Sequence, residues 1–273
     1  MSMEGIMKGT ATQRYGWSSE PGRPDEEKTL EIFIREAAQA GYDGVENFEE
    51  GIGEVAAEYG VRVAGAYAGA KCHEGFEQVN PDGETMTLAQ ALAELGGDYL
   101  AVNCDPKGAW DNRERKTEDE LRRQGENLTK LAEQTAPLGL DLVMHNHAVS
   151  NDLHMDDLRS VTEFAGESVG VCLDTGWALT SEDEPVARIR ALGSRLRAVP
   201  LRNQFGEKPT EWLGEGDTDM AECIAALKEI GYDGWLTTEI YYRADTDLSA
   251  SMVDNQTRTV ALLRELWGSE YSG

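Results

Sequence analysis

The sequence has 273 residues, of which 40% are hydrophobic and 28% charged, and this length is enough to bury a large core. Fifty-one acidic residues against 25 basic ones leave a net charge of −26, which excludes binding to nucleic acid and to anionic membranes. No apolar run approaches the roughly 20 residues that a membrane helix needs, and the N-terminus lacks the pattern of a signal peptide. We therefore expect a cytoplasmic protein.

The acidic residues are spread along the whole chain instead of forming a tail, which indicates a solvated acidic surface. Only 8 of the 25 basic residues are Lys, and the other 17 are Arg. An acid-rich, Lys-poor surface suits a cytoplasm of high salt, where the repulsion between like charges is screened. Our hypothesis is therefore that the protein comes from a halophilic source.

The cysteines lie far apart in the sequence. There are four of them, Cys72, Cys104, Cys172 and Cys223, and they form no C-x-x-C pair. A structural zinc site and a disulfide framework are therefore not expected. Cys172 lies inside an apolar run, which favours a small buried side chain over a nucleophile.

Segments with the pattern of buried strands alternate with segments of helical periodicity along the whole chain. The expected strands are residues 9–12, 44–47, 61–67, 99–103, 141–146, 169–174, 196–201 and 235–239. The expected helices are residues 25–40, 51–59, 84–95, 117–138, 155–164, 184–192, 219–230 and 248–266. Eight such units predict an α/β fold, a single (β/α)8 TIM barrel that forms one domain over residues 1–273.

A doubly wound open sheet is the alternative fold. It would normally carry a Gly-rich phosphate loop after the first strand. Residues 11–17 read Ala-Thr-Gln-Arg-Tyr-Gly-Trp and lack the G-x-G-x-x-G pattern. The sequence therefore favours the barrel.

Local signals mark several helix ends. Thr117 followed by Glu120 predicts a helix start with a capping box. Glycines stand where five helices should end, at Gly41, Gly60, Gly96, Gly139 and Gly231.

Three apolar runs in the second half of the chain end in residues that bind metal or move protons. Residues 142–144 lead into His145-Asn146-His147, residues 169–173 into Asp174, and residues 234–238 into Glu239. The carboxyl ends of barrel strands meet at one mouth, where small-molecule sites are built. These ends therefore predict one divalent-metal site and an enzyme, with His145, Asp174 and Glu239 as metal ligands.

Each of these residues also has a purely structural interpretation. His145 and His147 would face the same side of a strand, and half of the four histidines in the chain fall here, which favours metal binding or proton transfer over a buried pair. Asp174 could be only a helix cap. A charge directly after a buried strand is costly unless it is paired or metal-bound, so we favour the ligand.

The same four-residue turn precedes the strand that ends at Glu46 and the strand that ends at Glu239. Gly-Tyr-Asp-Gly at residues 41–44 and again at residues 231–234 leads into a strand that finishes on Glu46 or Glu239. Two similar turns explain the shared turn residues but not the shared carboxylates. Glu46 is therefore a catalytic candidate, although capping of the short helix at Gly51 is an equal alternative.

Other residues at the same strand ends are candidates for substrate contacts. Arg202 and Asn203 follow the strand 196–201 and suit a polyhydroxylated or anionic substrate, with a plain surface loop as the alternative. Trp177 offers an apolar wall, and Asn103 ends the fourth strand. We therefore expect Arg202, Asn203, Trp177 and Asn103 to contact the substrate.

Five short motifs occur in one order along the chain. They are Gly41-Tyr-Asp-Gly-Val-Glu46, Val143-Met-His-Asn-His147, Val171-Cys-Leu-Asp-Thr-Gly-Trp177, Glu211-Trp-Leu-Gly-Glu-Gly-Asp-Thr-Asp219 and Gly231-Tyr-Asp-Gly-Trp-Leu-Thr-Thr-Glu239. Over nearly the whole chain, this pattern resembles the xylose-isomerase-like TIM-barrel superfamily of sugar and sugar phosphate isomerases and epimerases. The resemblance implies a carbohydrate substrate and a divalent metal ion, Mn²⁺, Mg²⁺, Co²⁺ or Zn²⁺.

The chain departs from that superfamily at two metal-ligand positions. The family takes Glu, Asp, His and Glu from strands five to eight, which places His145, Asp174, Pro200 and Glu239 at these positions. His145 replaces a frequent Glu, and Pro200 has no side-chain donor atom. His147 could compensate for Pro200, or the site could use three protein ligands and water, or the metal could be lost.

The resemblance implies proton transfer next to a carbonyl group. Glu239 and either His145 or His147, with Glu46 as a further candidate, would exchange that proton through an enediolate and so isomerise or epimerise a sugar. An inosose-dehydratase-like lyase and a metal-free sugar-binding barrel are the alternatives. Endonuclease-IV-like DNA repair is excluded, because its metal cluster needs more than four histidines and the charge of −26 opposes DNA. The sequence leaves the oligomeric state open, a homo-oligomer included.

If the acidic surface is an adaptation to high salt, molar KCl should raise the temperature of thermal unfolding by screening the repulsion between carboxylates. Thermal unfolding in low and in molar KCl measures this effect. An unfolding temperature that does not rise in molar KCl would sink the halophilic hypothesis.

Overall fold

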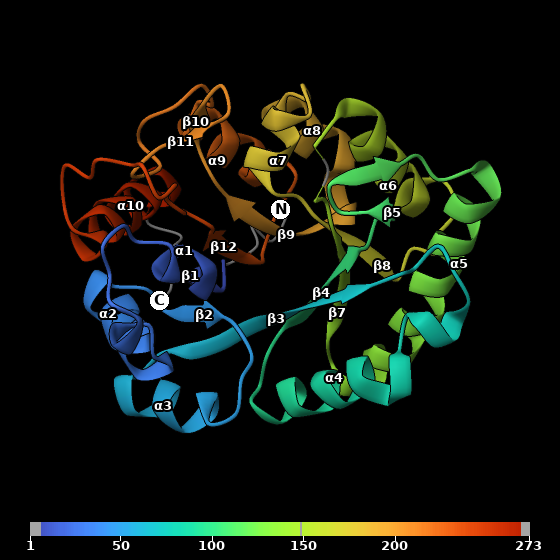
Figure 1. Cartoon of the computed structure of the whole chain (residues 1–273), viewed down its shortest axis with the longest axis horizontal. Helices are drawn as coiled ribbons and strands as arrows, with labels where there is room; N and C mark the ends of the chain where they lie inside the picture. The colour runs from blue at the N-terminus through green and yellow to red at the C-terminus, as the bar shows by residue number, and fades with distance from the viewer. Residues whose placement is uncertain (1–6, 148, 269–273) are drawn as a thin grey trace, which may run out of the picture.

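The structure, a computed structural model, describes residues 7–147 and 149–268. Parallel strands form a closed barrel in the order β1, β12, β9, β8, β7, β4, β3 and β2, and β2 pairs with β1 to close it (Figure 1). Their bounds are β1 Gly9–Gln13, β2 Gly44–Glu46, β3 Arg62–Ala70, β4 Tyr99–Cys104, β7 Asp141–His145, β8 Val169–Cys172, β9 Leu196–Leu201 and β12 Trp235–Thr238. The prediction of a (β/α)8 TIM barrel is confirmed.

Helices surround the barrel as an outer ring in Figure 1. They are α2 Leu30–Ala40, α3 Ile52–Tyr59, α4 Glu84–Glu94, α5 Glu118–Thr135, α6 Asn151–Thr162, α8 Pro185–Leu192, α9 Met220–Glu229 and α10 Met252–Trp267. Short 3-10 helices lie at Asp25–Glu27, Phe76–Gln78, Pro81–Gly83, Ala136–Leu138 and Gly193–Arg195.

Four short additions, none of them predicted, follow the carboxyl ends of strands. The helices α1 Arg14–Ser18 and α7 Thr175–Thr180 come after β1 and β8. The hairpins β5 Lys107–Ala109 with β6 Asn112–Glu114, and β10 Gln204–Phe205 with β11 Lys208–Pro209, come after β4 and β9. These additions therefore stand around the end of the barrel where the predicted site lies.

The interior of the barrel is filled mainly by small side chains and by two large aromatic ones. The buried cluster inside the barrel consists of Ala11, Ala64, Tyr99, Ala101, Val143, Cys172, Ala198 and Trp235. Glycines make room for the two rings, since a Cβ atom on Gly65 would lie 2.6 Å from Tyr99 and one on Gly44 would lie 2.8 Å from Trp235. Cys172 is fully buried here, as expected of a small hydrophobic side chain.

Side-chain caps set the starts of several helices, and they confirm one predicted start and correct two others. Thr117 and Glu120 form the predicted capping box at the start of α5. The expected helix 25–40 is wrong in its first part, because the Thr29 side chain accepts a hydrogen bond from the Ile32 amide and α2 begins only at Leu30. Ser251 similarly delays the start of α10 to Met252.

The fourth histidine, His154, lies in α6. Its ring is fully buried, and its Nε2 atom lies 2.8 Å from a carboxylate oxygen of Asp183. Arg188 donates to the same carboxylate at 2.6 Å. Burial would raise the pKa of Asp183, but the hydrogen bonds from His154 and Arg188 lower it to about 2. His154 therefore has a structural partner away from the barrel mouth.

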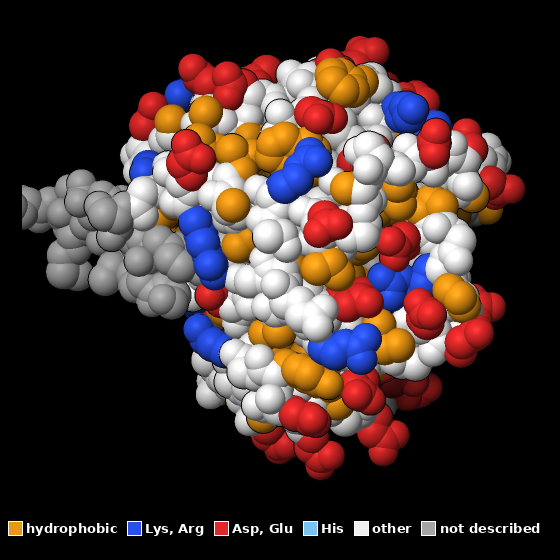
Figure 2. Space-filling view, turned by 90° about the vertical axis from the view of Figure 1, so that its left-hand side faces the viewer, with side chains coloured by type: hydrophobic (Ala, Val, Ile, Leu, Met, Phe, Trp, Pro, Cys, Tyr) orange, Lys and Arg blue, Asp and Glu red, His pale blue; other side chains and the backbone are white. Residues whose placement is uncertain are grey.

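One side of the molecule is shown in Figure 2, in which Asp and Glu side chains are scattered over the surface with Lys and Arg between them. The acidic residues on this face do not gather into one patch. Within the described residues, no helix is long and apolar enough to cross a bilayer.

Candidate active site at the carboxyl end of the barrel

Four neighbouring strands bring polar side chains to one point at the barrel mouth. His145 ends β7, Asp174 follows β8, Arg202 follows β9 and Glu239 follows β12. All four are buried, with exposed fractions of 2%, 0%, 5% and 9%. Because these strands are adjacent in the barrel, residues almost 100 positions apart in the sequence meet here.

His145, Asp174 and Glu239 form a cluster that could hold a divalent metal ion. One donor atom from each lies within 4.8 Å of the others, and His145 Nε2 is 3.9 Å from a carboxylate oxygen of Glu239. The Oδ1 atom of Asp174 accepts a hydrogen bond from the Trp177 amide at 2.7 Å, whereas its buried Oδ2 atom has no hydrogen-bond partner. The donor set thus fits a hard or borderline divalent cation and leaves coordination positions open for water or substrate.

Asp174 is fixed by its neighbours in two ways. It is the N-cap of α7, so the helix-cap interpretation of this residue is correct and compatible with the ligand interpretation. Asn146 also holds its backbone, because the amide nitrogen of Asp174 donates to Asn146 Oδ1 at 2.6 Å and Asn146 Nδ2 donates to the Asp174 carbonyl at 3.1 Å. This second role of the His-Asn-His motif was not predicted.

Arg202 brings a fixed positive charge to the carboxylates. Its Nε atom lies 3.1 Å from Asp174 Oδ1, and another guanidinium nitrogen lies 3.8 Å from Glu239 Oε1. The guanidinium packs against the rings of Trp177 and Tyr241, at 4.9 Å and 5.2 Å from their centroids. Arg202 therefore lies at the mouth with its guanidinium facing the acidic pair, and its contact with substrate remains a prediction.

The strand that carries Arg202 supplies no ligand atom at Pro200. Pro200 lies within β9 and pairs in register with Thr237 of β12. The strand stays paired in the barrel. Arg202, two residues further toward the mouth, provides a cation. In this part of the barrel mouth, the guanidinium of Arg202 thus stands beside the carboxylates of Asp174 and Glu239.

Burial and the neighbouring charges shift the pKa values of the cluster. Burial raises the pKa of Asp174, and the nearby Arg202 only partly opposes this. Burial would also raise the pKa of Glu239, but the contacts with His145 and Arg202 lower it instead. Burial would lower the pKa of His145, but Glu239 beside it raises it. The two carboxylates are thus inequivalent, with Glu239 the stronger acid.

His147 lies beside the metal-compatible cluster rather than within it. Its ring centroid is 5.9 Å from that of His145, and it packs between Trp177 at 4.4 Å and Trp110 at 5.3 Å. Burial lowers the pKa of His147 to about 4, so its imidazole is neutral at pH 7. A neutral imidazole can accept or donate a hydrogen bond to a sugar hydroxyl.

A cavity of about 370 Å³ opens above these residues. It is lined by Gln13, Arg14, Tyr15, Glu46, Asn47, Phe48, Tyr67, His145, His147 and Glu239. Glu46, left undecided by the sequence, therefore shares one cavity with His145 and Glu239. The aromatic residues Tyr15, Phe48 and Tyr67 in this lining were not predicted, because the sequence carries no signal that separates an aromatic ring that contacts a ligand from one that only packs.

Glu46 is held by two hydrogen bonds. Gln13 Nε2 donates to its Oε1 atom at 3.0 Å, and the hydroxyl of Tyr99, which rises through the barrel interior, donates to its Oε2 atom. Burial raises the pKa of Glu46, and the hydrogen bond from Tyr99 opposes this only in part. In the strand order, β2 lies across the barrel from β8, so Glu46 and Asp174 stand on opposite sides of the mouth.

The two predicted asparagines are buried and engaged with the protein. Asn203 Nδ2 donates to the carbonyls of Leu213 and Thr218, at 3.2 Å and 2.8 Å. Asn103 Nδ2 donates to Asp105 at 3.0 Å. Their contact with substrate remains a prediction, and Asn203 has a clear structural role in the loop after β9.

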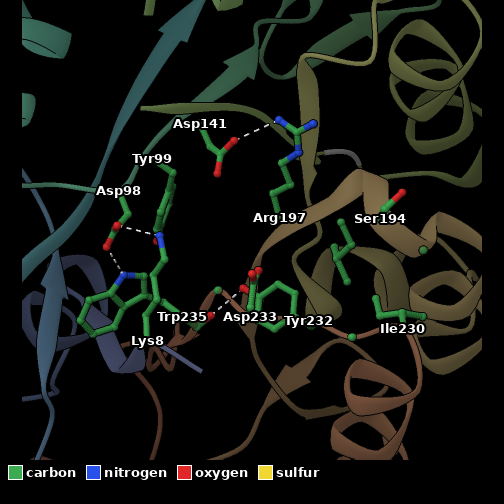
Figure 3. Close-up of a pocket in the computed structure, with 14 residues that line it drawn as sticks. Lys8, Asp98, Tyr99, Asp141, Ser194, Arg197, Ile230, Tyr232, Asp233 and Trp235 are labelled. Atoms are coloured by element: carbon green, nitrogen blue, oxygen red, sulfur yellow. Dashed lines mark hydrogen bonds and ion pairs between the residues drawn. The ribbon is translucent and has the colours of Figure 1, made fainter. Parts of the chain in front are cut away.

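A second cavity, of about 230 Å³, lies at the opposite end of the barrel, where the strands begin (Figure 3). Its charged side chains face one another in pairs: Lys8 is 2.6 Å from Asp98, and Arg197 is 3.0 Å from Asp141. The indole nitrogen of Trp235 also donates to Asp98 at 2.7 Å. These partners are mutually satisfied, which fits the stabilising role of this face in TIM barrels.

Gly176 is required for the position of Arg202. A Cβ atom on residue 176 would lie 2.3 Å from Arg202 Nε, and this guanidinium is buried and paired, so it cannot move away cheaply. Gly176→Ala should therefore lower the free energy of unfolding by roughly 1–3 kcal/mol. Urea unfolding measures this change.

Gly53→Ala in α3 is the matched control for Gly176→Ala. The added Cβ would meet Leu95 Cδ2, the end of a side chain that is 38% exposed and free to turn aside. This substitution should leave stability unchanged or raise it by up to about 1 kcal/mol. Equal effects of the two substitutions would contradict the argument.

Similar proteins were found by sequence and by structure. The rhizopine catabolism protein MocC of Rhizobium meliloti is 28% identical over 249 residues, covering 77% of this chain and 74% of that protein. An inosose dehydratase of Geobacillus kaustophilus is 25% identical over 213 residues, covering 67% of this chain and 68% of that enzyme. A solved structure of L-ribulose 3-epimerase superposes with a TM-score of 0.72 at 16% identity, covering 97% of this chain and 96% of that one.

The family model described as "xylose isomerase-like TIM barrel" matches residues 34–265. The match includes β2 to β12 and all four residues of the charged cluster. Relatives and structural neighbours include sugar epimerases and inosose dehydratases, which supports an enzyme. The chain belongs to the xylose isomerase-like TIM-barrel family.

Proposed function

We propose that this protein moves a proton next to the carbonyl group of a keto-carbohydrate and so isomerises or epimerises it. The observation that carries the proposal is the meeting of His145, Asp174 and Glu239 at the barrel mouth, with donor atoms within 4.8 Å of one another. In the proposed site these three residues hold a divalent metal ion. When bound, such an ion would polarise the substrate carbonyl as a Lewis acid.

The residues around the cavity have complementary proton-transfer properties. Glu239 is a carboxylate at neutral pH, because His145 and Arg202 lower its pKa against the effect of burial. It suits the base that takes the proton from the carbon next to the carbonyl. Glu46 has a pKa raised by burial and lines the same cavity, so it suits the acid that returns a proton from another side. When Glu239 removes this proton to give an enediolate and Glu46 returns a proton to the same carbon from the other side, that carbon is inverted, which is epimerisation. If the proton returns instead to the former carbonyl carbon, and the hydroxyl proton moves to the former carbonyl oxygen, the carbonyl group changes place, which is isomerisation.

Arg202 and His147 orient the substrate. Arg202 places its fixed charge beside Asp174, where it can also stabilise the negative oxygen of an enediolate. His147, which stays neutral, offers a hydrogen bond to a hydroxyl group in the cavity.

Dehydration is the second candidate function. The same base would remove the proton next to the carbonyl, and the acid would then protonate a β-hydroxyl group that leaves as water. Glu46, a buried carboxyl group whose pKa is raised, suits that acid. The inosose dehydratase relative adds support. A metal-free sugar-binding barrel is the third candidate, supported by the absence of a donor atom at Pro200.

Metal binding is tested by isothermal titration with Mn²⁺ and by elemental analysis. Asp174→Ala and Glu239→Ala should each weaken metal binding by about tenfold or more, because each removes one of three protein ligands. Asp141→Ala, at the opposite end of the strand that carries His145, is the matched control and should bind metal normally. Metal binding that is unchanged in all three variants would refute the assigned ligands.

Proton transfer is tested by incubating ketoses and inososes with the protein and Mn²⁺ in D₂O. Deuterium should enter the carbon next to the carbonyl, and Glu239→Gln should slow this by a factor of about 100 or more. Dehydration would instead produce a conjugated enone, seen by its ultraviolet absorbance. If neither deuterium nor an enone forms with any substrate, the sugar-binding alternative replaces both enzymatic functions.

A further inference from the structure

Tyr99 connects the strand that ends at Glu46 with the strand that precedes Glu239. It begins β4, and its hydroxyl donates a hydrogen bond to Glu46 Oε2 at the end of β2. The same hydroxyl lies 3.2 Å from Thr237 Oγ1 of β12. Because Tyr99 has one hydroxyl proton and gives it to Glu46, the Thr237 hydroxyl is the donor in the second contact. A chain of hydrogen bonds thus runs from β12 to the carboxyl group of Glu46.

Gly65 makes room for this chain. Glu46 pairs in register with Gly65 of β3, and Gly65 pairs with Tyr99 of β4, so the three residues lie side by side on neighbouring strands. The ring of Tyr99 crosses the middle position, where a Cβ atom would lie 2.6 Å, 2.7 Å and 2.9 Å from three of its ring atoms. The absence of a side chain at residue 65 therefore lets the Tyr99 hydroxyl pass over β3 and reach Glu46.

The chain is buried and lies outside the cavity at the mouth. Tyr99, Glu46 and Thr237 have exposed fractions of 3%, 4% and 1%. The residues of the described chain that line the cavity at the mouth include Glu46 but not Tyr99. Tyr99 lines the second cavity instead, at the opposite end of the barrel (Figure 3). Any effect of its hydroxyl on a substrate at the mouth must therefore pass through Glu46.

We propose that Tyr99 is a positioning residue that holds Glu46 in place opposite Glu239, so that the site inverts a carbon instead of only exchanging its proton. This inference rests on the proposed function, in which Glu239 takes the proton and Glu46 returns one from the other side. Without the Tyr99 hydroxyl, only the hydrogen bond from Gln13 holds the Glu46 carboxyl group, which then turns away from the reacting carbon. Glu239 returns a proton to the side from which it took one, and the carbon keeps its configuration.

Tyr99→Phe tests the inference in D₂O with Mn²⁺ and two probes, D-fructose and scyllo-inosose. Deuterium should still enter the carbon next to the carbonyl in the recovered probe, since Glu239 is intact and exchanges its proton with solvent. Formation of the epimer should fall by about tenfold or more, because a displaced proton donor loses most of its effect. The ratio of deuterated probe to epimer should therefore rise about tenfold, whereas a general loss of structure would lower both.

Tyr232→Phe is the matched control. Tyr232 is 4% exposed, and its hydroxyl donates to the Trp235 carbonyl at 2.7 Å, so this variant also loses one buried phenol hydroxyl. It should leave the ratio unchanged. Glu46→Gln should raise the ratio at least as much as Tyr99→Phe does. Adding Tyr99→Phe to Glu46→Gln should raise it no further, because Tyr99 acts only through Glu46.

Crystal structures of the wild-type protein and of Tyr99→Phe show the position of Glu46 without any reaction. The Glu46 carboxyl group should leave its wild-type position in the variant. An unmoved Glu46, an unchanged ratio in Tyr99→Phe, or a further rise of the ratio in the double variant would overturn the inference. If neither probe takes up deuterium with the wild-type protein, the proposed function fails, and the crystal structures still decide whether Tyr99 holds Glu46.

Discussion

The site depends on the meeting of two buried carboxylates beside one guanidinium. Asp174 and Glu239 are both buried at the barrel mouth, and two like charges this close would strongly oppose folding without a cation. Arg202 supplies that charge at 3.1 Å and 3.8 Å. Two aromatic rings and the missing Cβ of Gly176 keep the guanidinium in place. The arrangement fixes the acids in the positions that a metal ion would need.

The same ion pair bears on the missing ligand atom at Pro200. A barrel that lacks a ligand atom on one strand loses part of its hold on a metal, and Arg202, two residues further along that strand, reduces the negative charge of the site. Both features favour a metal ion bound by three protein ligands and open to exchange. The family resemblance alone does not predict this effect. The resemblance rests on the residues that the chain shares with the family, whereas the effect comes from the positive charge that Arg202 adds.

Much of the fold and part of the site followed from the sequence. The meeting of His145, Asp174 and Glu239 was predictable, because parallel strands of a closed barrel bring their carboxyl ends together and a polar residue after an apolar run lies at that end. The hydrogen bond from Tyr99 to Glu46 was not predictable, because Tyr99 begins its strand and reaches the mouth only by crossing the barrel interior. The hairpin β5–β6 likewise has no periodic pattern in the sequence, so the position of Trp110 beside His147 was not predictable.

These observations combine in one description of the mouth, in which acids and a neutral imidazole lie deep and aromatic rings lie further out. The central claim is that His145, Asp174 and Glu239 hold a divalent metal ion beside Arg202. Anomalous diffraction from crystals soaked in MnCl₂ tests it most directly. The account predicts one strong peak between these three side chains, with Arg202 still paired to Asp174. No peak there, with Arg202 bridging the two carboxylates, would contradict it.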